Sequence, residues 1–127
     1  MQKCSDFIAD FLAKNHITHV YDLAGGMIVN LEDSISRTKG MLCFPMHHEQ
    51  AAGIEAEGYS RLNGNLGVAM ATRGPGATNV ITDIGSCNFD SILTLLLTGQ
   101  VTVKLIRTTK YIRKNGFESK NMFYIVK

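Results

Sequence analysis

The sequence has 127 residues, of which 45% are hydrophobic and 19% charged, and its formal net charge is +2. These values are typical of one globular domain and argue against a disordered chain, and the small net charge does not by itself indicate a nucleic-acid partner. The longest apolar run, Ile92 to Leu97, is too short to span a bilayer. Three separated cysteines (Cys4, Cys43 and Cys87) without a C-x-x-C motif, and the lack of a signal peptide, predict a reduced, cytoplasmic protein.

Hydrophobic periodicity predicts helices alternating with strands along the chain. A first helix has Ser5 as its expected N-cap and ends at Asn15. Strands are expected at residues 20–23, 41–44, 67–72 and 91–98. Helices are expected at about residues 28–35 and 48–62, with a further helix that carries Val80, Ile81 and Ile84.

This order of elements predicts an α/β fold, with three layers (α/β/α) and a mostly parallel sheet covered by helices on both faces. The third strand is apolar at successive positions, as a buried parallel strand should be, and Met27 and Met70 are expected in the core. After Val101 the pattern weakens. Residues 103–106 and 122–126 are candidate strands, and the basic stretch between them is interpreted as a solvated tail rather than a nucleic-acid surface.

Four loops should meet at one edge of the sheet, because each follows a parallel strand at its carboxyl end. They are Ala24-Gly25-Gly26, His47-His48-Glu49, Arg73-Gly74-Pro75-Gly76 and Gly99-Gln100. Glycine lets a ligand approach the backbone closely. The loop at 73–76 matches neither the Walker motif nor the dinucleotide fingerprint, however, and a tight turn with a helix cap explains it equally well.

Glu49 is expected in the first turn of the helix at residues 48–62. An acid there is stabilised by the helix dipole, and this structural role is the more common one. Its position at a strand end also makes it a candidate to act on a bound ligand. No metal site is expected, because His47 and His48 are adjacent and Cys43 is the one near candidate for a third zinc ligand.

Several sequence motifs occur in a fixed order along residues 1–101. They are His48-Glu49-Gln50-Ala51-Ala52-Gly53, Ala56-Glu57-Gly58-Tyr59-Ser60-Arg61, Gly64, Gly74-Pro75-Gly76-Ala77-Thr78-Asn79, Asp90-Ser91-Ile92 and Thr98-Gly99-Gln100-Val101. With these motifs the chain resembles the N-terminal pyrimidine-binding domain of thiamine-diphosphate enzymes, and the acetolactate-synthase group in particular. The resemblance implies the thiamine diphosphate-binding fold, with a core at residues 1–101 and a diverged segment of the same domain at 102–127.

The resemblance implies that Glu49 is catalytic and hydrogen-bonds N1′ of the cofactor's aminopyrimidine ring. A carboxyl group in a dry cleft can share a proton with a ring nitrogen. The imino form at the 4′ position then removes the thiazolium C2 proton, and the resulting ylid attacks a 2-keto acid. The further cofactor-binding residues that the resemblance implies are Gly25, Gly26, Thr72, Pro75, Asn79 and Gln100.

The sequence departs from the family pattern at three positions near these motifs. Ala24 and Leu93 stand where the family usually has proline, and Arg73 stands where it usually has serine. An arginine beside the cofactor loop could pair with Glu49. In the segment at 113–121 the family positions are held by Arg113, Gly116 and Phe117.

Subunits of this family are several times longer and carry a diphosphate-binding domain with a Gly-Asp-Gly…Asn magnesium motif, which does not occur here. Mg²⁺ is therefore expected only through a missing domain or a partner chain, and the use of FAD stays open. We expect the last strand and helix of the domain to be missing, which leaves an unpaired sheet edge and marginal stability.

Three functions stay open from the sequence. The first is thiamine diphosphate binding in an enzyme that decarboxylates or ligates 2-keto acids, as a homodimer or with a partner chain. The second is a non-catalytic remnant or dimerisation module, which the departures at Ala24, Arg73 and Leu93 favour. The third and weakest is a free-standing nucleotide binder that uses the loop at Gly74.

Overall fold

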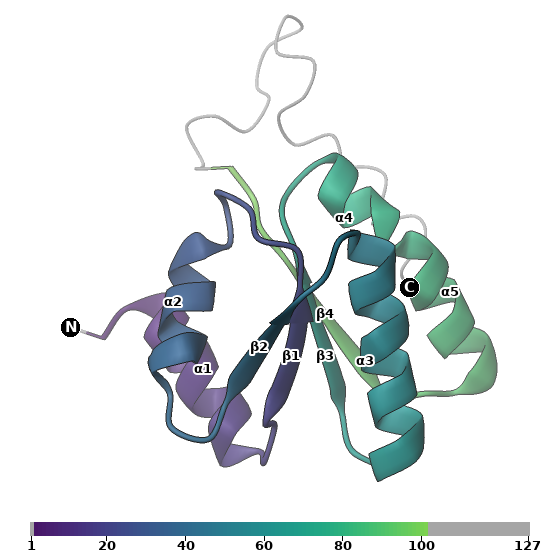
Figure 1. The fold of residues 1–127 in the computed structure, drawn as a ribbon, viewed down its shortest axis with the longest axis horizontal. Helices are drawn as coiled ribbons and strands as arrows, with labels where there is room; N and C mark the ends of the chain where they lie inside the picture. Colours follow the sequence, from purple (N-terminus) through teal and green to yellow (C-terminus); the bar gives the residue numbers. More distant parts are fainter. Residues whose placement is uncertain (1, 102–127) are drawn as a thin grey trace, which may run out of the picture.

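The computed structural model describes residues 2–101, which form one parallel sheet with helices on both faces (Figure 1). The strands are β1 (His19–Asp22), β2 (Leu42–Pro45), β3 (Gly67–Ala71) and β4 (Thr94–Thr98), in the spatial order β2-β1-β3-β4. The helices are α1 (Cys4–Lys14), α2 (Val29–Arg37), α3 (Glu49–Asn63), α4 (Pro75–Asn79) and α5 (Ile81–Asp90). The predicted α/β fold with a parallel sheet is thus confirmed, while the segments expected beyond residue 101 lie outside the described residues.

Helices α1 and α2 cover one face of the sheet, and α3, α4 and α5 cover the other (Figure 1). Strand β3 lies inside the sheet and is buried at all of its residues. A Cβ atom on Gly67 would lie 2.7 Å from the carbonyl carbon of Ala56, so the backbone of α3 packs directly on β3. This close approach fixes α3, and with it the start of the helix at Glu49.

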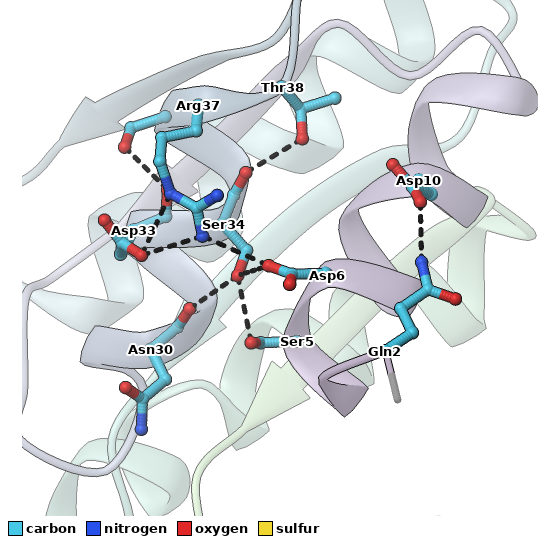
Figure 2. Close-up of polar contacts among 10 residues, drawn as sticks. Gln2, Ser5, Asp6, Asp10, Asn30, Asp33, Ser34, Arg37 and Thr38 are labelled. Atoms are coloured by element: carbon cyan, nitrogen blue, oxygen red, sulfur yellow. Dashed lines mark hydrogen bonds and ion pairs between the residues drawn. The ribbon is translucent and has the colours of Figure 1, made fainter.

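The other face holds the larger apolar core, between the sheet and the pair α1 and α2. Its buried members are Ala9, Leu12, Ile17, Val20, Ile28, Ile35, Met41, Val68 and Met70. Polar contacts join the two helices at their surface (Figure 2). Ser34 Oγ lies 2.8 Å from an Asp6 oxygen, and Arg37 reaches Asp6 at 3.1 Å and Asp33 at 2.9 Å.

The expected N-cap of the first helix is wrong. Helix α1 begins at Cys4, and its N-cap residue is Lys3, whose side chain makes no capping hydrogen bond. Ser5 lies inside the helix, and its hydroxyl contacts Ser34 Oγ at 2.9 Å. The side chain that was expected to cap α1 therefore joins it to α2.

Two more boundaries differ from the prediction. The helix expected around residues 80–84 is two short helices that meet at Val80. The last described strand begins at Thr94 rather than at Ser91, because α5 continues to Asp90 and Ser91 closes it with a left-handed φ of 56°. No helix within residues 2–101 is long and apolar enough to cross a membrane.

Candidate functional site

Loops that follow three of the strands meet around Thr72 at the carboxyl edge of the sheet. A Cβ atom on Gly25 would lie 2.5 Å from Thr72 Cβ, and one on Gly76 would lie 2.9 Å from Thr72 Cγ2. The Gly76 position is also close to Glu49, with 3.1 Å between its ideal Cβ and Oε1. Only glycine allows these approaches, so the predicted meeting of the three loops is confirmed.

The fourth loop, Gly99-Gln100, packs against Met27, which directly follows the first loop. A Cβ atom on Gly99 would lie 2.7 Å from Met27 Cβ, and Gly99 N donates to the carbonyl oxygen of Ala71 at 2.9 Å. Met27 is 46% exposed, so its expected place in the core is wrong, whereas Met70 is buried as predicted. Met27 instead packs the loop after β1 against the end of β4.

Glu49 is the first residue of α3 and is only 8% exposed. His48 caps the helix in an extended conformation, and its Nδ1 accepts from the backbone N–H of Gln50 at 3.1 Å. The Glu49 carboxylate accepts at Oε2 from Asn79 Nδ2, at 2.9 Å, while Oε1 faces Gly76. The acid is therefore held in one orientation over the meeting point of the loops.

The pairing expected between Arg73 and Glu49 does not occur. The ion pairs among the described residues do not include this one, and the donor that Glu49 receives is the neutral amide of Asn79.

The other residues implied by the resemblance lie farther out at the same edge. Pro75 is exposed in the first turn of α4. Gly26 is exposed, with no atom within 4 Å of an ideal Cβ. Gln100 follows β4, and its Oε1 accepts from the N–H of Val101 at 2.8 Å. Gly25, Thr72 and Asn79 thus form the enclosed part of the candidate site around Glu49, and the remaining three lie on its open side.

The motif residues Glu57, Arg61 and Asp90 join α3 to α5 rather than contributing to this edge. Arg61 lies 2.5 Å from Glu57 Oε1 and also pairs with Asp90. Ser86 donates to the same Glu57 oxygen at 3.2 Å. The hydrogen bond from Arg61 lowers the pKa of Glu57, so this acid stays ionised as a structural anchor.

Two buried acids were not singled out from the sequence. Asp22 is 4% exposed, and burial together with the neighbouring Glu32 raises its pKa to about 7. Asp83 is 2% exposed against Gly53 of α3, and burial, with a further contribution from Glu57, raises its pKa to about 6. The available signal was the position of each acid within an otherwise apolar run.

The chain is similar to known proteins along most of its length. The family described as thiamine pyrophosphate enzyme, N-terminal TPP binding domain, matches residues 2–122. The acetolactate synthase large subunit of Buchnera aphidicola subsp. Schizaphis graminum is 36% identical over 102 residues, covering 80% of this chain and 18% of the relative. Acetolactate synthase isozyme 1 large subunit of Escherichia coli K12 is 37% identical over 107 residues, covering 84% and 19%. The chain thus spans less than a fifth of the length of these relatives.

Proposed function

Because the chain belongs to the thiamine pyrophosphate enzyme family through the N-terminal TPP-binding domain, we propose that it binds the aminopyrimidine ring of thiamine diphosphate at the Glu49 edge. One observation carries the proposal: the buried Glu49 carboxylate accepts a hydrogen bond from Asn79, and its Oε1 lies beside the Cα of Gly76, where any side chain would crowd it. A carboxyl group held in this way can share a proton with a ring nitrogen.

The residues present fit such a ring. A side chain at position 76 would fill the space beside Glu49 Oε1, and a side chain at position 25 would press on Thr72. Glycine at both positions keeps room for a flat group against the backbone. Gly26, Pro75 and Gln100 are proposed to contact the cofactor from the open side of this edge.

Thiamine diphosphate supplies the electron sink for decarboxylation or ligation of 2-keto acids. In this proposal Glu49 holds a proton at a nitrogen of the pyrimidine ring. Asn79 keeps the carboxylate oriented, and the packing of α3 on β3 fixes the distance between the acid and the loops. The protein thus contributes position and electrostatics rather than a nucleophile.

In this proposal the complete reaction requires a second domain or a second chain. The diphosphate and Mg²⁺ would be bound by another domain or chain, in a cytoplasmic homodimer or with a partner. A non-catalytic dimerisation module is the second candidate, and the exposed apolar residues Ile54 and Leu62 on α3 and Phe89 on α5 favour it.

Calorimetric titration of the chain with thiamine diphosphate and Mg²⁺, with and without a polypeptide that carries the diphosphate-binding domain, tests the proposal. We expect saturable binding that Glu49→Gln weakens at least about tenfold, because the variant lacks the carboxyl group that shares a proton with the nitrogen of the pyrimidine ring. Glu55→Gln is the matched control, since Glu55 is an exposed acid on the same helix.

Equal binding by the wild type and by Glu49→Gln would contradict the proposal. Self-association detected by light scattering, without any thiamine diphosphate binding even when the partner is present, would support the dimerisation module instead.

A further inference from the structure

The carboxyl groups of Asp22 and Glu32 meet on the sheet face that α1 and α2 cover, whereas Glu49 begins a helix of the opposite face (Figure 1). Asp22 is the last residue of β1 and is 4% exposed, and Glu32 lies in the first turn of α2. The two side chains form a hydrogen bond with each other. An ionised carboxylate can only accept, so this bond requires a proton that the two groups share.

Nothing else in the described part of the chain stabilises this acid pair. Apart from the shared proton, the buried atoms Asp22 Oδ1 and Glu32 Oε1 have no hydrogen-bond donor among residues 2–101. The ion pairs of these residues do not include either acid, and Arg37 pairs instead with Asp6 and Asp33. Loss of the shared proton therefore leaves two like charges side by side with no counter-charge.

The groups that face Asp22 from the neighbouring elements do not change their charge near neutral pH. On β2, burial, reinforced by the two acids, raises the pKa of the Cys43 thiol to about 11, so it stays neutral. On β3 the neighbour in register is the apolar Met70, and on α2 the nearby Asp33 is paired with Arg37. Burial and the hydrogen-bonded partner raise the pKa of Asp22 itself to about 7.

The acid pair brackets the segment that carries the first loop of the candidate site. Gly25 and Met27 of this segment pack against the loops that follow β3 and β4. The carbonyl oxygen of Gly25 accepts from the N–H of Val29 at 3.1 Å, so α2 begins directly from this loop. The hydrogen bond between Asp22 and Glu32 thus fastens α2, and the loop before it, to β1.

Of the two acids, Glu32 is the one that can move. Strand β1 lies inside the sheet, where Asp22 is in register with Pro45 of β2 and Met70 of β3. Glu32 lines a pocket of about 360 Å³ between α2 and the ends of β1 and β2. Repulsion between two ionised carboxylates therefore displaces Glu32 into this pocket and toward water.

We propose that the Asp22–Glu32 pair is a pH-sensitive clasp that holds residues 23–31 against the carboxyl edge of the sheet and releases them as pH rises. The pKa of Asp22 is about 7 in the closed state and returns to about 4 once the side chain meets water. By linkage, the equilibrium constant for opening rises about tenfold between pH 6 and pH 8. The clasp needs no ligand, whereas any weakening of thiamine diphosphate binding at high pH rests on the proposed function.

Amide hydrogen exchange of the full chain at pH 6 and pH 8, divided by the intrinsic exchange rate at each pH, tests the proposal. We expect the protection factors of Val29 and Glu32, whose N–H groups donate to Gly25 and Ile28, to fall about tenfold. In Asp22→Asn and Glu32→Gln, an amide N–H replaces the shared proton at every pH. Both variants should therefore keep the same protection at pH 6 and pH 8.

Asp83→Asn is the matched control, because it replaces the other buried acid, on the opposite face of the sheet. Since the clasp opens locally, this variant should keep the tenfold fall of the wild type at Val29 and Glu32. The amides of β3, inside the sheet, should be more strongly protected than these two. Circular dichroism checks that each variant is folded.

Three results would overturn the proposal. They are a wild-type protection that does not change between pH 6 and pH 8, a tenfold fall that persists in both Asp22→Asn and Glu32→Gln, and protection of Val29 and Glu32 equal to that of β3. The first and the third are measured on the wild type and do not require a variant to fold. None of them depends on cofactor binding, so the clasp and the proposed function fail separately.

Discussion

The orientation of Glu49 depends on one neighbour, Asn79, whose amide donates to Oε2 at 2.9 Å. Because the acceptor is a buried acid, Asn79→Ala should lower the free energy of unfolding by about 1–3 kcal/mol. Urea denaturation measures this change. The matched control is Asn88→Ala, which truncates an exposed asparagine of α5 and should change stability by less than about 0.5 kcal/mol.

A double-mutant cycle separates this hydrogen bond from other effects of truncation. In a Glu49→Ala background, Asn79→Ala should cost less than half of its value in the wild type, because the acceptor is already gone. Equal costs in the two backgrounds would show that Asn79 acts through packing and not through Glu49.

Individual residues of the site were predictable where a loop follows a strand. Glu49, Thr72 and Asn79 come together because parallel strands end at one edge, which the alternation of strands and helices already implies. Asp22 and Asp83 were not singled out, because the burial of an acid depends on the partner element. For Asp83 that partner is Gly53 of α3, thirty residues earlier in the chain.

Helix α3 is held by small residues on the side that meets the sheet and α5. A Cβ atom on Gly53 would lie 2.5 Å from Asp83 Cγ, whereas one on Gly58 would meet no atom within 4 Å. Gly53→Ala should therefore lower the free energy of unfolding by about 1–3 kcal/mol through overpacking. Gly58→Ala should raise it by about 0.5–1 kcal/mol, because alanine favours the helix.

Chemical denaturation of Gly53→Ala and Gly58→Ala measures both changes in stability. The two variants are matched, because each replaces a glycine of α3 by alanine. A stability gain in Gly53→Ala as large as that in Gly58→Ala would mean that α5 does not pack on α3 as described.

Most elements were predictable from periodicity, and their ends were less so. Helix α3 begins and ends within one residue of its prediction, since Glu49 and Gly64 are clear start and stop signals. The start of β4 was predicted three residues early because Ile92 and Leu93 are apolar, like the strand itself. Leu93 is 70% exposed, and nothing in its hydrophobicity distinguishes it from a strand residue.

Considered as a whole, the described part of the molecule carries a buried acid on each face of its sheet. Asp22 lies on the α2 side and Asp83 on the α3 side. Burial raises the pKa of both above the usual value of an aspartate. The folded chain therefore binds protons more tightly than the unfolded chain, and its stability is linked to pH.

The sign of this dependence is that stability falls as pH rises. Both acids are protonated in the folded state below pH values of about 7 and 6, whereas in the unfolded state they ionise near pH 4. The contribution is fully present below the unfolded pKa and is lost as pH rises through the folded pKa. Asp6 and Glu57, whose pKa values are lowered, weaken the fold only in more acidic solution.

We therefore expect the free energy of unfolding to fall by about 2–3 kcal/mol between pH 5.5 and pH 8, as measured by urea denaturation across this range. Asp22→Asn should remove the larger part of this slope and Asp83→Asn the smaller part, because Asp22 has the higher folded-state pKa. Asp10→Asn, which changes an exposed acid, should keep the slope of the wild type. A wild-type stability that is constant or rises from pH 5.5 to pH 8 would contradict the burial of the two acids, because an acid that stays ionised in the folded state has no proton to lose in this range.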